Sequence, residues 1–166
     1  LQGRFLTGLA YNPEFSLLYL YSKYEKKIIA VNQNGQLKKT LDISTLELEN
    51  LQGMVFAHST DPTDDPDQMN LFLSDEGSRS RVIELSLTEI GSLEFLTETI
   101  STSVVRVVDT SAWSPPSPDP AGIEYLPGTN RLFVVDSEVD EMSIFEGNNT
   151  FTASTSGTLV SSCTTM

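Results

Sequence analysis

Apolar residues alternate with polar ones at a period of two in short runs along this chain, and the pattern recurs three times. Each copy begins with a glycine, an apolar residue and, two places further on, an aromatic residue. A turn, an apolar run ending in Ser or Asp, a polar turn and an alternating run follow. A period of two predicts β-strands rather than helices. The predicted strands are residues 7–13, 18–22 and 27–31; 52–56, 71–75 and 81–85; and 121–125, 132–136 and 141–145.

A fourth strand follows each copy. Residues 37–43 come after an Asn-Gly pair that suits a hairpin turn, and residues 158–164 come after Ser156 and Gly157. In the second copy the outer strand falls between residues 93 and 108, and its register stays open. Four antiparallel strands repeated at roughly forty residues are typical of propeller blades. The sequence therefore predicts an all-β propeller segment of three four-stranded blades, at about residues 6–44, 50–108 and 119–166, with no helix of consequence.

The recurring residues of the repeat have a structural interpretation. The glycine lets the innermost strand approach its neighbours closely at the central channel. The recurring aromatic residues of the first strands are expected to be core or channel residues; they are Tyr11, Phe56 and Tyr125. Those of the second strands are expected to pack between blades; they are Tyr19, Phe72 and Phe133. Two insertions, residues 58–68 and 109–120, are rich in Asp, Pro and Ser and are predicted to be loops.

Three blades are too few to close a ring, because propellers carry four to eight. The missing blades come either from a longer chain or from other copies, which would form a closed dimer or a filament. The sequence begins with Leu1 and not with Met, which suggests a processed piece from which an export signal could have been removed.

The chain is strongly acidic, with 23 carboxylates against 10 basic residues and a net charge of −13. This charge argues against nucleic acid and anionic membranes as partners, and an acidic surface favours solubility. No apolar run approaches the length of a membrane-spanning helix, so no membrane insertion is expected. The single Cys163 has no partner for an internal disulfide and is expected to be semi-buried near a strand end.

Three stretches resemble one family of proteins. They are residues 61–66 before residues 69–71, residues 112–122, and residues 135–142. Here the sequence resembles bacterial secreted six-bladed propellers of the phytase-like and NHL-like type, which occur in calcium-binding, hemolysin-type surface proteins. The resemblance implies a secreted or cell-surface protein. It is much less specific for an activity, because one fold hosts many functions.

Calcium is the natural cation to consider, because clustered carboxylates supply the oxygen ligands it prefers. Neither acidic loop has the spacing of an EF-hand, and a solvated acidic loop is the alternative interpretation. The candidate ligands are Asp61, Asp64, Asp65 and Asp67 in one loop and Asp136, Glu138 and Asp140 in the other, next to Glu141.

Catalysis is the less favoured hypothesis. The resemblance implies a calcium-dependent phosphoesterase as the enzymatic alternative, with carboxylates such as Asp75 or Asp136 as ligands, but the chain has little basic charge to hold a polyanion. His58 is the only histidine, and no Gly-x-Ser-x-Gly motif surrounds a serine, so a serine hydrolase is disfavoured.

Two surface features add alternatives. Asn148 begins an Asn-Asn-Thr sequon and is a candidate glycosylation site, although a polar hairpin explains it equally. Exposed aromatic residues such as Trp113 would suit a carbohydrate- or peptide-binding propeller. The function we favour from the sequence is a non-catalytic, extracellular or cell-surface module for assembly and binding. Its partners would be other copies of itself or further blades.

Overall fold

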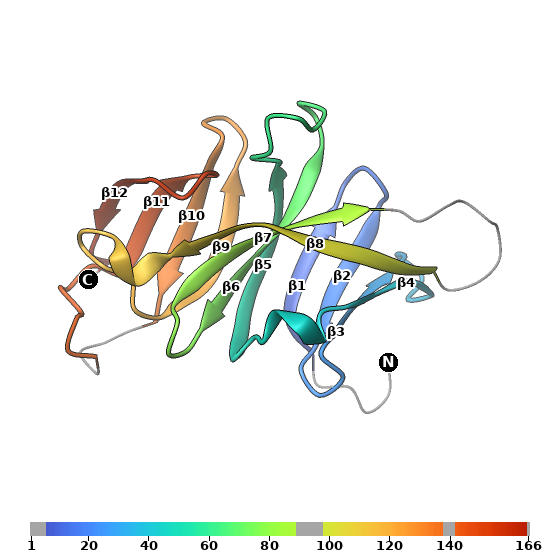
Figure 1. Cartoon of the computed structure of the whole chain (residues 1–166), viewed down its shortest axis with the longest axis horizontal. Coiled ribbons are helices and arrows are strands. Elements are labelled where there is room, and N and C mark those ends of the chain that lie inside the picture. Colours follow the sequence, from blue (N-terminus) through green and yellow to red (C-terminus); the bar gives the residue numbers. More distant parts are fainter. Residues whose placement is uncertain (1–5, 89–97, 138–141, 166) are drawn as a thin grey trace.

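The structure is a computed structural model that describes residues 6–88, 98–137 and 142–165. Three four-stranded antiparallel blades stand side by side along the long axis of the molecule (Figure 1). Blade 1 contains β1 (Leu6–Asn12), β2 (Leu17–Ser22), β3 (Lys27–Val31) and β4 (Leu37–Asp42). Blade 2 contains β5 (Asn50–His58), β6 (Met69–Glu76), β7 (Arg81–Thr88) and β8 (Glu98–Asp109). Blade 3 contains β9 (Pro120–Leu126), β10 (Arg131–Asp136), β11 (Thr150–Ser154) and β12 (Leu159–Cys163).

This architecture confirms the predicted all-β segment of three four-stranded blades. In the described ranges the helical elements are two single 3₁₀ turns, η1 (Ser44–Leu46) and η2 (Thr110–Ala112). No helix in these ranges has the length and apolar character needed to cross a membrane.

Each blade has two faces, because successive side chains of a strand point in opposite directions. We call the face toward the preceding blade the front face and the face toward the next blade the back face. The back face of blade 1 packs on the front face of blade 2 in one apolar cluster that includes Tyr19 and Phe56. The back face of blade 2 packs on the front face of blade 3 in a second cluster that includes Phe72 and Tyr125. The fold thus has two cores, one in each seam between blades.

The recurring glycine does what the repeat predicted in the two closed seams. A Cβ atom on Gly8 would lie 2.9 Å from Cδ2 of Leu51 in β5, and a Cβ atom on Gly53 would lie 2.9 Å from the backbone nitrogen of Ile123 in β9. Both distances are shorter than Cβ atoms normally show. At Gly53 the neighbour is backbone, so only glycine allows β5 and β9 to come this close, whereas at Gly8 the Leu51 side chain would have to shift. At Gly122, in blade 3, a Cβ atom would meet nothing closer than Cβ of Val135 at 3.7 Å.

Blades 1 and 2 are also joined at their outer edges. Strand β8 is long: residues 101–109 pair antiparallel with β7, whereas residues 98–100 pair in parallel with residues 39–41 of β4. The eight strands of these two blades therefore form one continuous hydrogen-bonded sheet, and β8 runs across both blades in Figure 1. The four strands of blade 3 form a separate sheet.

The third strand of blade 3 was predicted at the wrong place. The alternating residues 141–145 suggested a strand, but the described part of this segment forms turns, and Phe145 donates its backbone N–H to the carbonyl of Met142. The strand next to β10 is β11, about nine residues further on. The apolar side chains of the turn segment, Met142 and Ile144, are exposed, whereas Phe151 and Ala153 of β11 are buried.

The acidic insertion between β5 and β6 is attached to blade 2 by a buried carboxylate that the sequence analysis did not identify. Glu84 is 1% exposed and accepts hydrogen bonds from the backbone and hydroxyl of Thr60 and from the Asn70 amide. Arg106 of β8 donates to the same hydroxyl group. This network holds the start of the insertion against the sheet.

Candidate functional site

The front face of blade 1 carries apolar side chains that no blade of the described residues covers. Positions that are equivalent in the repeat make the contrast clear. Leu9 is 59% exposed, but its counterparts Met54 and Ile123 are 4% and 8% exposed. Tyr11 is 48% exposed, but its counterparts Phe56 and Tyr125 are 4% and 9% exposed.

The same contrast continues on the second strand. Leu18 and Leu20 are half-buried, and the side chains in register with them in blades 2 and 3 are fully buried. The recurring aromatic residues that face a closed seam therefore pack in the cores as predicted, whereas Tyr11 is not a core residue in this chain. The open front face consists of Leu9, Tyr11, Leu18 and Leu20.

The back face of blade 3, at the other end of the row of blades, is also left uncovered by the described residues. Phe133 is half-buried, whereas its counterparts Tyr19 and Phe72 are each 1% exposed. Val135 beside it is largely exposed, and Gly122 faces free space on the inner strand. This face also carries Glu124 where blades 1 and 2 have an alanine and a valine. The open back face consists of Gly122, Glu124, Phe133 and Val135.

The charged residues are also distributed unevenly between blade 1 and blade 3. All five lysines of the sequence lie in blade 1, between Lys23 and Lys39, together with three carboxylates. Blade 3 has one arginine and six carboxylates between residues 120 and 163. Blade 1 is thus weakly basic and blade 3 is acidic, although the chain as a whole is strongly acidic.

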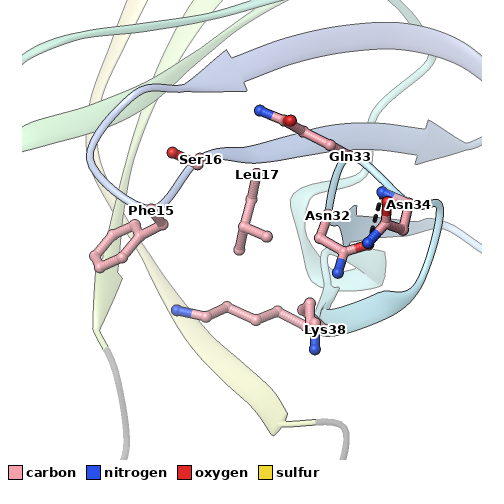
Figure 2. A pocket seen from close by; sticks show the side chains of 8 residues that line it. Phe15, Ser16, Leu17, Asn32, Gln33, Asn34 and Lys38 are labelled. Atoms are coloured by element: carbon pink, nitrogen blue, oxygen red, sulfur yellow. Dashed lines mark hydrogen bonds between the residues drawn. The ribbon is translucent and has the colours of Figure 1, made fainter.

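A shallow cavity of about 540 Å³ lies at one end of blade 1 (Figure 2). Its walls are the turn around Phe15 and Leu17, the hairpin tip at Gln33 and Asn34, and the start of β4. The Lys39 ammonium group lies 4.4 Å from the centre of the Phe15 ring, a cation–π arrangement. Lysine is therefore held against the apolar wall of this cavity.

Three of the acidic residues predicted to bind calcium in the first loop accept local hydrogen bonds, and the fourth, Asp67, is exposed in the same loop. Asp61 accepts from the backbone and hydroxyl of Thr63, and these bonds, the hydroxyl first, lower the pKa of its carboxyl group. Asp64 accepts from Ser59 Oγ at 2.5 Å, and Asp65 accepts from the backbone of Asp67. Each carboxylate stabilises a turn of the insertion.

The second acidic loop is only partly described. Glu138 and Asp140 lie outside the described residues. Asp136 is 3% exposed and accepts from Ser117 Oγ at 2.5 Å and from the backbone nitrogen of Asp119 at 2.9 Å. Across the described ranges, no three His, Cys, Asp or Glu side chains come together as a metal site would require. Calcium binding therefore stays a prediction.

Asp75 occupies the position in blade 2 that Asp136 occupies in blade 3. Its Oδ2 atom accepts from Nη2 of Arg81 at 2.9 Å, and its Oδ1 atom accepts from the backbone nitrogens of Glu49 and Asn50. Both aspartates therefore bind the segment that leads into the first strand of their own blade. The hydrogen bonds described for both carboxylates are therefore made within the fold.

Three further residues proposed from sequence lie as follows. Trp113 is half-buried against Phe151, with ring centroids 5.7 Å apart, and donates Nε1–H to the carbonyl of Gly157; it is not an exposed platform. Cys163 is exposed at the end of β12, so the semi-buried position expected for it was wrong. Asn148 is half-buried in the loop before β11, and its glycosylation stays a prediction.

Comparisons with known proteins show a similarity of fold alone. No protein-family model matches the sequence, and a search of curated proteins finds no match. A solved structure of hydrazine synthase from Kuenenia stuttgartiensis is similar over 95% of this chain and 36% of that chain, with 16% identity and a TM-score of 0.55. A luciferin-regenerating enzyme is similar over 85% of this chain and 40% of that chain, with 14% identity and a TM-score of 0.52.

This chain therefore spans about two-fifths or less of the length of the proteins it resembles in structure. At these sequence identities the similarity concerns the fold alone. The chain is a β-rich, propeller-like protein of three blades.

Proposed function

We propose that this protein is a non-catalytic propeller module, extracellular or at the cell surface, that works by assembling with further blades. The observation that carries the proposal is the open front face of blade 1. Four apolar positions that are buried in the seams of blades 2 and 3 are exposed or half-exposed in blade 1. Exposed apolar surface of this kind, at sites a repeat reserves for packing, is an association site.

We further propose that a second copy of the chain supplies the missing blade. The back face of blade 3 has the aromatic side chain and the free glycine that the internal seams use, so it can pack on blade 1 as blade 1 packs on blade 2. Its Glu124 would need a cationic partner in such a seam, and blade 1 is the lysine-bearing part of the chain. Two copies joined in this way at both ends make a closed ring of six blades, within the range of known propellers.

Light scattering after size exclusion tests this proposal. The purified chain should have twice its single-chain mass of 18.3 kDa. Replacing Leu9→Asp and Tyr11→Asp should give a folded monomer, because both side chains are exposed and only association requires them to be apolar. The matched control is Val104→Asp, an equally exposed apolar residue on β8 of blade 2, which should leave the mass unchanged. A wild-type chain that stays monomeric at about 1 mM, where even weak complexes form, would overturn the proposal.

A further inference from the structure

The two seams inside the chain share one register, so they indicate which residues would meet in a seam between two copies. A Cβ atom on Gly8 of β1 would lie 3.0 Å from Cγ of Met54 in β5. A Cβ atom on Gly53 of β5 would lie 2.9 Å from the backbone nitrogen of Ile123 in β9. Met54 and Ile123 are counterparts in the repeat, and each directly follows the glycine of its own blade. The glycine of one blade therefore meets the residue after the glycine of the next blade.

Two residues further along each inner strand, the side chains point to the same face again. The same offset pairs Ala10 with Phe56 in the first seam and Val55 with Tyr125 in the second. Each pair is buried in the apolar cluster of its seam. Tyr19, which is the cross-strand neighbour of Ala10, packs edge-on against Phe56 with the ring centroids 4.9 Å apart. The register seen at the glycines thus continues along the strands.

In a seam between copies, this register pairs Glu124 of blade 3 with Tyr11 of a second copy, an inference that rests on the proposed assembly. Glu124 stands where blades 1 and 2 have an alanine and a valine, so it is the one charged residue at this position of the repeat. Its cross-strand neighbour is Phe133. The Tyr11 ring would therefore pack against Phe133 as the Phe56 ring packs against Tyr19.

Both polar groups of this pair have hydrogen-bonding capacity to spare. The Tyr125 hydroxyl donates to Oδ1 of Asn130 at 3.0 Å, but blade 1 has Ser16 in place of Asn130, and the Tyr11 hydroxyl has no hydrogen-bond partner among the described residues. Oε1 of Glu124 accepts from the backbone of Tyr125, and its other oxygen accepts from no described residue. A carboxylate that loses water in a seam needs a donor, because an unpaired buried charge is costly.

We propose that the Tyr11 hydroxyl donates a hydrogen bond to the Glu124 carboxylate of the next copy, and that this pair gives the assembly its direction. A hydrogen bond to a carboxylate is stronger than one between neutral groups. Two back faces placed together would bring two carboxylates into one seam without a donor, which disfavours that contact. All five lysines of blade 1 come after β2 in the chain, so Tyr11 is the side-chain donor in register with Glu124.

A double-mutant cycle on the dissociation constant of the dimer, measured by analytical ultracentrifugation, tests the pair. Tyr11→Phe and Glu124→Val introduce the residues that blade 2 has at these positions, so both variants should fold. Tyr11→Phe should raise the dissociation constant about ten-fold for each seam, or about 100-fold for a closed ring with two seams, because it leaves the carboxylate without a donor. In the Glu124→Val background, the same change should alter it by less than about three-fold.

Tyr24→Phe is the matched control. Tyr24 is 77% exposed in the turn after β2, outside the open front face, so loss of its hydroxyl should leave the dissociation constant unchanged. An effect of Tyr11→Phe that is equal in both backgrounds, or absent from the wild-type background, would overturn the pair and leave the assembly intact. A wild-type chain that stays monomeric would instead overturn the assembly and the pair together.

Discussion

Two aspartates at equivalent places in the repeat show how much a single side chain contributes to a blade. Asp75 and Asp136 lie within the last two residues of the second strand of their blades, and each accepts hydrogen bonds from the segment that leads into the first strand. The repeat places Ser22 at the same position in blade 1, where its hydroxyl donates to Glu25. The sequence pattern identified these positions, but it did not show whether their oxygen atoms face a cation or the chain itself.

Replacing Asp75→Asn should destabilise blade 2. The carboxylate is 1% exposed and pairs with Arg81, and removing one partner leaves the other charge partly buried and uncompensated. We expect the free energy of unfolding to fall by about 3 kcal/mol, measured by urea denaturation. The control is Asp67→Asn in the exposed insertion, which should change it by less than about 0.5 kcal/mol. Similar effects of the two substitutions would contradict the role assigned to Asp75.

Asp119 gives the protein a predictable dependence on pH. Burial raises the pKa of its carboxyl group above the ordinary 3.8, Ser137 opposes this by a hydrogen bond, and the nearby Glu76 and Asp136 add to the rise. The fold therefore favours the protonated form, so this contribution to stability is full below the ordinary pKa and is lost as pH rises through the raised one.

Asp119→Asn keeps an acceptor for the Ser137 hydroxyl and removes the charge. The variant should melt at a higher temperature than the wild type at pH 7, and the difference should shrink as pH falls to about 4. Thermal melts at several pH values measure this directly. A difference that stays constant with pH would show that Asp119 does not titrate as its surroundings imply.

At the scale of elements, the distance between the inner strands β5 and β9 depends on the absence of a Cβ atom at Gly53. Gly53→Ala would place a Cβ atom 2.9 Å from the backbone of Ile123 and 2.7 Å from Oγ of Ser74. The β5 and β9 strands would have to separate, and overpacking of this kind costs about 2 kcal/mol. Gly128→Ala is the matched control, because a Cβ atom there meets nothing within 4 Å. Chemical denaturation of both variants measures the difference, and equal stability would contradict the close approach.

Much of the element order could be read from the sequence, and the failures have physical causes. Strands with apolar residues on both faces, such as β6, stand out because both faces are buried in seams. Strand β11 does not stand out, because Phe151 and Ala153 are the only apolar residues among its five, and both are buried. The more apolar segment just before it contributes exposed side chains instead. The parallel pairing of β8 with β4 depends on where two blades meet, which no local pattern records.

The candidate site was only partly predictable for a related reason. The repeat shows which residues are equivalent, and equivalence identified Leu9 and Tyr11 as counterparts of core residues. Their exposure depends on the blade that stands in front of them, which is a property of the assembly.

At the scale of the whole molecule, the two open faces should recognise each other and not themselves. Gly122→Val would fill the space that a partner's inner strand needs, and its Cβ atom meets nothing in the single chain closer than Val135 at 3.7 Å. We expect this variant to be a folded monomer, with Gly128→Val as the control that still associates. Light scattering measures both masses.

Mixing two monomeric variants tests the head-to-tail arrangement itself. Leu9→Asp keeps an intact back face and Gly122→Val keeps an intact front face, so one good contact can form between them. The mixture should contain particles of two chains that neither variant forms alone. A mixture that stays monomeric would contradict the contact between unlike faces, because the mixture supplies one intact face of each kind.

The long strand β8 also determines where the molecule would break under mechanical load. Backbone hydrogen bonds cross from blade 1 to blade 2 through residues 98–100, whereas no strand of that sheet pairs with a described strand of blade 3. The second seam is held by the packing of side chains. A few hydrogen bonds from side chains to the backbone also cross it, such as that from Ser74 Oγ to the carbonyl of Ala121. A molecule stretched between its ends should therefore yield first between blades 2 and 3 and extend as a four-stranded piece and an eight-stranded piece. Shearing the paired strands of the larger piece would take the greater force.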